Sequence, residues 1–210
     1  MKLLNSTSDV IYYKNSGPLT QPFLEKDFVY EKVLIDLNHK QKDINSTYFL
    51  ESLSLWIKHE VAYSNEYEIQ NKKFSRTAKE IWDSKKGSGC TDYALLFATF
   101  ARSLDIPTTI LHTAQLEWLK RYKNKSDYFV HYGHTFCECF FNNKWILVDP
   151  SSCKIINNYD QTKIILSYNI AGNNIYIPYY RGLDFGQKST VGEHNKIMEE
   201  KCDKLDLDLT

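Results

Sequence analysis

The sequence lacks a net charge, a long apolar run and an even set of cysteines. Its 210 residues carry 26 basic and 26 acidic side chains, so no field of one sign draws the chain to nucleic acid or to an anionic membrane. The start, MKLLNSTSDV, turns polar after two leucines, too soon for a signal peptide, and no later stretch approaches the ~20 apolar residues of a membrane span. We therefore expect a cytoplasmic protein without a nucleic-acid or membrane partner.

The cysteines also lack the spacing of a disulfide framework. There are five, Cys90, Cys137, Cys139, Cys153 and Cys202, an odd number that fits free thiols better than paired ones. Three of them, at positions 137, 139 and 153, can be combined with His131 as a zinc site, but C-x-C is not the usual spacing for zinc. We expect neither a metal nor another cofactor.

The composition is that of one globular domain. Apolar residues make up 42% and aromatic residues 14% of the chain, which is enough for a sizeable core over residues 1–210. We divide this domain into an N-terminal extension (1–44), a core (45–185) and a C-terminal helix or tail (186–210). The extension is interpreted as strands and loops, because DVIYYK and DFVYEKVLIDL favour β structure and GPLTQP marks a turn.

Helices are expected in the first part of the core. Apolar residues recur at helical spacing after a cap at Ser46 or Thr47. The segment SRTAKEIWDSKKG predicts a second helix that stops at Gly87. A third begins near Cys90, is apolar almost all round, and ends before Pro107, so we expect it to be buried.

Strands follow the helices. They are predicted in TTILHTAQLEWL, in the two runs of HTFCECFFNNKWILVDPSS joined at Asn142-Asn143, in KIILSYNI and in NNIYIPYY, and TVGEHNKIMEEKCDKL is a candidate terminal helix. Helices first and strands afterward predict an α+β fold, in which the central helix packs on an antiparallel sheet.

Cys90 stands where a helix would activate a thiol. The first turn of a helix presents unpaired N–H groups and a partial positive charge, both of which favour the thiolate and an oxyanion nearby. The small residues Gly87, Ser88 and Gly89 before it let a substrate or another backbone approach closely. The ordinary alternative is that Cys90 only fills the core, as buried cysteines often do.

The predicted hairpin supplies candidates for a base and its orienting group. A two-residue Asn142-Asn143 loop pairs Phe141 with Lys144 and, by extension, Phe136 with Asp149. In that register His134 and Asp149 are diagonal neighbours on one face, roughly 7–8 Å apart between Cα atoms. A slip of one residue would place them on opposite faces. Cys137 and Cys139 face away from His134 and are expected in the core.

The ordered segments resemble a known family. GSGCTDYALLFATFARSLDIPTTIL followed by GHTFCECFFNNKWILVDPS is similar to the core of the transglutaminase-like superfamily, over roughly residues 47–153. The resemblance implies a papain-like fold with the nucleophile Cys90 on a helix, and with the general base His134 and the orienting Asp149 on adjacent strands. The family also uses an upstream side chain at the oxyanion hole, for which Trp56, Tyr63 and Gln70 are candidates.

The chemistry that follows is attack of the Cys90 thiolate on an amide carbonyl of a protein or peptide, giving a thioester acyl-enzyme. If water is the acyl acceptor, the protein is a cysteine protease or amidase, and we favour this hypothesis of hydrolysis. An amine as the acceptor would make it a transglutaminase. A non-catalytic binding module that keeps the fold is the alternative from another class.

Overall fold

The three-dimensional structure, a computed structural model, describes residues 7–36, 46–125, 130–157, 159–160, 165–167 and 174–205. In chain order its elements are α1 (Thr7–Tyr12), α2 (Lys26–Asp36), α3 (Tyr48–Glu60), β1 (Ala62–Tyr63), α4 (Tyr67–Asn71), α5 (Ala78–Ser84), β2 (Lys86–Gly87), α6 (Cys90–Ser103), β3 (Thr108–Gln115), α7 (Leu116–Lys123), β4 (Gly133–Phe141), β5 (Lys144–Asp149), β6 (Lys154–Ile156), β7 (Ile165–Ser167), β8 (Asn174–Gly182) and α8 (Val191–Asp203). Among these helices none has the length and apolar character that a membrane span needs.

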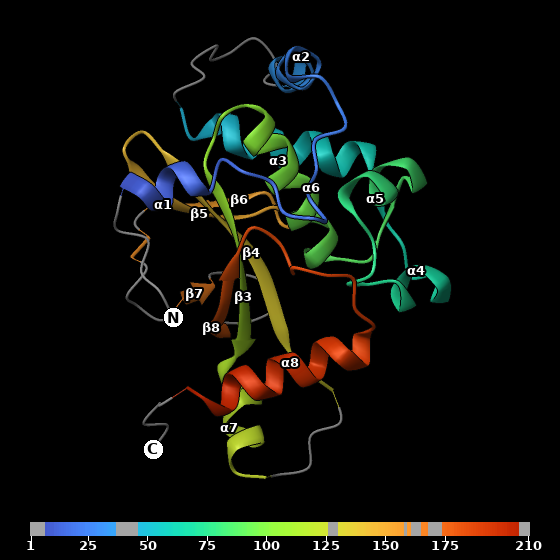
Figure 1. Cartoon of the computed structure of the whole chain (residues 1–210), viewed down its shortest axis with the longest axis vertical. Helices are drawn as coiled ribbons and strands as arrows, with labels where there is room; N and C mark the ends of the chain where they lie inside the picture. The colour runs from blue at the N-terminus through green and yellow to red at the C-terminus, as the bar shows by residue number, and fades with distance from the viewer. Residues whose placement is uncertain are drawn as a thin grey trace.

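The main sheet is antiparallel and carries helices at both ends of one face. Its strands, within the described residues, follow the order β6-β5-β4-β3-β8-β7. Helix α6 packs on β3 and β4, whereas α7 and α8 lie toward the opposite end of β3 and β8 (Figure 1). The predicted α+β architecture, with a central helix on an antiparallel sheet, is confirmed.

Helix α6 is the centre of the core. All its side chains from Thr91 to Arg102 are buried, which explains the apolar residues around nearly its whole circumference. It packs against α2, α3 and α5 and, across the sheet face, against Ile110, Cys137 and Val148. A second apolar cluster lies between α7, α8 and the far end of β3. The two clusters therefore leave a gap over the middle of β3.

The β4–β5 hairpin has the predicted register. Asn142 and Asn143 have φ values of 52° and 60°, the left-handed pair that a tight two-residue turn requires. Phe141 pairs with Lys144, and Cys137 with Val148. The thiols at positions 137 and 139 are fully buried in the core, as expected.

Within residues 7–36, the described part of the N-terminal extension, the predicted strands are helices instead. DVIYYK lies mostly in α1 and DFVYEKVLIDL mostly in α2. Val29 and Val33, four residues apart, are both fully buried against the core around α3. That four-residue spacing is helical, so packing of one helix face outweighed the β preference of the valines and tyrosines.

Two predicted boundaries were also wrong. Helix α5 ends at Ser84, because Lys85 takes the left-handed conformation (φ 55°) that closes a helix, and Gly87 lies in β2 instead. The strand in TTILHTAQLEWL ends at Gln115. Its last residues start α7, whose Trp118 is buried in the second cluster.

The remaining predicted elements lie near the end of the chain. The strand in KIILSYNI is present at Ile165–Ser167, and positions 163–164 and 168–170 of that prediction lie outside the described residues. NNIYIPYY begins at position 173, also outside the described residues, and forms β8 from Asn174. The C-terminal helix is confirmed as α8, where Thr190 and Glu193 form a capping box.

Candidate active site

Cys90 is the first residue of the central helix α6. The preceding Gly89 has a φ of 134°, which L side chains rarely adopt. The Ser88 N–H and hydroxyl donate to the Asp92 carboxylate at 2.6 and 2.8 Å, and Asp92 also forms a buried ion pair with Arg76. The segment before the cysteine is therefore held by a side chain from the first turn of the helix itself.

His134 and Asp149 come together from adjacent strands. His134 is the second residue of β4 and Asp149 the last of β5. His134 Nε2 lies 3.0 Å from Asp149 Oδ2, which is ion-pair distance. The diagonal relation that the hairpin register predicts is thus realised as a side-chain contact.

Asp149 is held as a charged group. Its Oδ1 accepts bonds from the Ser151 N–H (3.0 Å) and hydroxyl (2.7 Å), and its Oδ2 accepts one from the Ser152 hydroxyl (2.7 Å). Burial raises the pKa of this carboxyl, but His134 and the serine donors outweigh burial and lower the pKa to about 2. The turn after β5 thereby fixes the carboxylate that faces the imidazole.

Cys90 and His134 stabilise each other's charged forms. Burial raises the thiol pKa, but the charge of His134 and a hydrogen bond to it, assisted by Lys73 and the Thr135 N–H, lower it to about 6. Burial lowers the imidazole pKa, but Cys90 and Asp149 raise it to about 10. A thiolate–imidazolium pair is therefore the favoured state near neutral pH.

The β4 backbone contributes a donor to the Cys90 sulfur. Strand β5 pairs with β4 from Phe141 back to Cys137 only. Thr135 lies beyond that paired stretch, and its N–H donates to the Cys90 thiolate.

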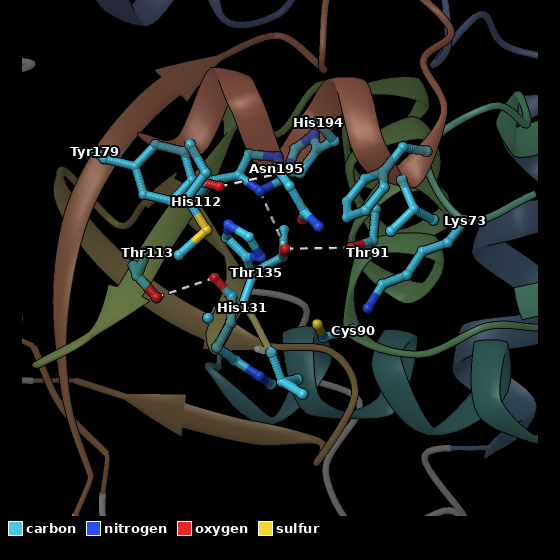
Figure 2. Close-up of a pocket in the computed structure, with 16 residues that line it drawn as sticks. Lys73, Cys90, Thr91, His112, Thr113, His131, Thr135, Tyr179, His194 and Asn195 are labelled. Atoms are coloured by element: carbon cyan, nitrogen blue, oxygen red, sulfur yellow. Dashed lines mark hydrogen bonds between the residues drawn. The ribbon is translucent and has the colours of Figure 1, made fainter. Parts of the chain in front are cut away.

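A cleft of about 240 Å³ adjoins Cys90. It is the gap left between the two apolar clusters, and Figure 2 shows side chains that converge on it from several elements. Thr91 lies beside the cysteine on α6, His112 on β3, and His194 and Asn195 on α8, while Lys73 comes from the segment between α4 and α5.

Sequence reasoning missed three residues of this cleft: Lys73, His112 and His194. His112 shares a strand face with Ile110 and Ala114 in β3, both fully buried, so alternation along the strand is the signal that could have placed it inside the protein. Nothing in the pattern indicated that the other two would face it. Only the fold brings α8 and the 73–74 segment to this strand.

The three upstream candidates for an oxyanion donor lie in different surroundings. Trp56 is buried in the core against Trp82. Tyr63 is exposed, with its ring edge 3.9 Å from the position that a Cβ on Gly89 would take. Gln70 Nε2 donates to the backbone oxygens of Ser64 (2.6 Å) and Ser88 (3.3 Å), so it holds the loop before Cys90.

The residues considered for zinc are separated. Cys137 Sγ contacts the Ala94 carbonyl under α6, whereas His131 Nε2 lies 2.7 Å from Glu199 beside α8. Across the described ranges no three histidine, cysteine or acidic residues gather to hold a metal ion.

Comparison with known proteins matches the same region. A family model described as the Transglutaminase-like superfamily matches residues 36–150, more than half of the chain. A solved structure described as "a Putative Cysteine Protease from Cytophaga hutchinsonii" superposes with a TM-score of 0.53 at 15% identity, over 90% of this chain and 52% of that one. The chain thus spans about half the length of that protein, and at this identity the likeness concerns the fold.

A structure described as "a TGase" superposes less well, with a TM-score of 0.40 at 14% identity over 77% of this chain and 37% of that one. No curated protein matches the chain at a significant level.

Proposed function

Since the chain belongs to the transglutaminase-like superfamily, we propose that it is a thiol-dependent amide hydrolase with Cys90 as nucleophile, His134 as general acid and base, and Asp149 as the group that orients the imidazole. The substrate is a protein or peptide. The observation that carries the proposal is the contact of His134 with Asp149 at 3.0 Å beside a cysteine whose pKa is lowered to about 6.

The reaction runs through a thioester. The Cys90 thiolate attacks the amide carbonyl, and the oxyanion that forms lies at the N-terminus of α6, where backbone N–H groups lack helical acceptors. His134 gives its proton to the leaving nitrogen as the C–N bond breaks. It then takes a proton from water, which attacks the thioester and releases the acid and the thiolate.

Two other functions use the same residues. In acyl transfer an amine replaces water in the second half-reaction. In a non-catalytic binding module no acyl-enzyme forms at all. The lowered pKa of Cys90 favours an enzyme over the binding module, because packing alone would raise a buried thiol's pKa. We also propose a reducing, cytoplasmic location, since all five thiols are free.

The decisive experiment is trapping of the acyl group. The protein is mixed with 4-nitrophenyl acetate, quenched in acid and digested, and acetylation is mapped by mass spectrometry. We expect a burst of nitrophenol with the acetyl group on Cys90, absent in Cys90→Ala and retained in the matched control Cys153→Ala, which removes the other half-buried thiol. Acetylation spread over all cysteines would contradict the proposal.

The acceptor is identified with a second assay. Blocked synthetic peptides are incubated with the protein, with and without excess methylamine, and analysed by mass. Shorter peptides or deamidated side chains in both samples indicate hydrolysis. Methylamide products that dominate when the amine is present indicate acyl transfer. Intact peptides in both samples, together with no acetylation of Cys90, would favour the binding module.

A further inference from the structure

The cleft beside Cys90 has a lining with an unbalanced charge. Lys73 is half-buried there, and in Figure 2 its side chain extends toward Cys90. Apart from the histidines it is the one cationic lining residue, and no aspartate or glutamate is among the described residues that line the cleft. An anion entering the cleft would therefore meet a counter-charge and no carboxylate in the wall.

The acidic side chains near the cleft already have partners. Glu199 faces His131 at 2.7 Å, Asp92 is paired with Arg76, and Asp149 lies behind His134. Lys73, by contrast, forms no ion pair within the described part of the chain, and its Nζ lies 5.4 Å from the centroid of the Phe74 ring. Its charge is thus directed to the cleft and its contents.

His112 adds an unsatisfied hydrogen-bonding atom. The residue is 3% exposed. Its Nδ1 lies 3.3 Å from the Thr135 hydroxyl, which is 3.5 Å from the Thr91 hydroxyl, but its Nε2 has no partner. A buried polar atom without a hydrogen-bond partner destabilises the folded protein. For a residue that lines a cleft, a bound ligand can supply the missing partner.

The protonation of His112 favours a donor role. Burial, then His194 and Lys73, lower the pKa of His112 well below its ordinary value, so the ring is neutral. When Nδ1 accepts the Thr135 hydroxyl proton, the ring hydrogen lies on Nε2. That N–H is then a donor without an acceptor in the described part of the chain.

We propose that this cleft selects acyl substrates that carry a carboxylate close to the reacting carbonyl, with Lys73 as the counter-charge and His112 Nε2 as the hydrogen-bond donor. The inference rests on the proposed function, because it assumes an acyl group on Cys90. At about 240 Å³ the cleft is below the size of sites for whole ligands. It suits one small group, such as an acidic side chain or a short dicarboxylic acyl chain.

Two alkylating reagents test the carboxylate directly. Iodoacetate and iodoacetamide both form a C–S bond and release iodide, and they differ in carrying a carboxylate or a neutral amide. The ratio of their rate constants at Cys90, measured by mass spectrometry, cancels the thiolate fraction and the nucleophilicity of the sulfur. It therefore reports how the cleft treats the negative charge.

We expect the rate constant of iodoacetate divided by that of iodoacetamide to fall roughly three- to fivefold in Lys73→Gln, which is the scale of a partly exposed charge pair. Added salt should reduce the difference in this ratio between the wild type and Lys73→Gln. Lys73→Arg keeps the charge and should keep the ratio. Lys72→Gln is the matched control, since Lys72 is exposed and does not line the cleft. An equal ratio in wild type and Lys73→Gln would overturn the carboxylate site.

Acyl donors extend the test to substrates. Mono-4-nitrophenyl glutarate should acylate Cys90 faster than its neutral methyl ester in the wild type, and Lys73→Gln and His112→Phe should lose that preference while still reacting with the ester. Equal rates with both donors in the wild type would refute the inference while leaving the proposed function intact. Failure of Cys90 to react with any reagent faster than Cys153 would instead overturn the proposed function.

Discussion

The pH dependence of Cys90 alkylation depends on a single contact, that with His134. The thiol pKa is about 6, against an ordinary 9.0, because the attraction to His134 outweighs burial. A shift of three units corresponds to ~4 kcal/mol in favour of the thiolate. Replacing the imidazole by a methyl group in His134→Ala removes the main lowering cause and leaves burial, so the thiol pKa should rise to or above the ordinary value.

The choice of pH decides whether the effect is visible. Near pH 7 the wild-type thiol is roughly 90-fold more ionised than a thiol of pKa 9, but its thiolate is a weaker nucleophile by roughly 20-fold, so the net advantage is only about fivefold. Near pH 5.5 the ratio of ionised fractions reaches about 760, and the net advantage is about 35-fold. The acidic measurement is therefore the discriminating one.

The assay is iodoacetamide alkylation from pH 5 to 10, resolved by residue with mass spectrometry. Cys153 serves as the internal reference, since burial raises its pKa above the ordinary value. His59→Ala is the matched control, because the His59 side chain is 83% exposed and does not line the cleft. A midpoint for Cys90 near 9 in the wild type, or the same midpoint in wild type and His134→Ala, would refute the reasoning.

The charged Cys90–His134 pair has both a lower and an upper pH limit. The pKa of Cys90 is depressed to about 6, so the stability from its charged form is lost as the pH falls through 6. The pKa of His134 is raised to about 10, so its contribution is lost as the pH rises through 10. The charged pair is therefore complete between these two values.

Three further substitutions test the supports of the site. A Cβ in Gly133→Ala would lie 2.4 Å from the Thr113 carbonyl, so we expect a stability loss of ~1–3 kcal/mol in urea unfolding and slower Cys90 alkylation; wild-type behaviour would contradict the close strand approach. Asp92→Asn leaves the buried Arg76 charge uncompensated and should cost ~3–5 kcal/mol by the same measurement, whereas a loss under 1 kcal/mol would argue against it. Thr190→Ala removes the capping box of α8 and should cost ~1 kcal/mol, seen as faster amide exchange in its first turn; unchanged exchange would refute the cap's role.

The sequence was most informative where the pattern was local. The register of the β4–β5 hairpin followed from Asn142-Asn143 alone, because a two-residue turn determines which residues face each other. The start of α6 at Cys90 followed from glycine before an apolar run. The hairpin register alone was enough to predict that His134 and Asp149 lie close together.

The sequence was misleading or silent where tertiary packing decides. Valine and tyrosine in the first residues favoured strands, but Val29 and Val33 gain more by burial as one helix face. His112 is marked as inward by alternation in β3, yet its partners Lys73 and His194 come from segments far away in the chain. Contacts between segments that are distant in the chain produce no periodic pattern in the sequence.

The position of α8 also sets the order in which the cleft is assembled. Cys90 is synthesised well before Val191–Asp203, and chains emerge from the ribosome N-terminus first. A nascent chain that ends before α8 already contains the thiol, His134 and Asp149, but it has no wall from His194 or Asn195. Docking of α8 on β8 thus completes a wall around Lys73 and His112, which precede it in the chain.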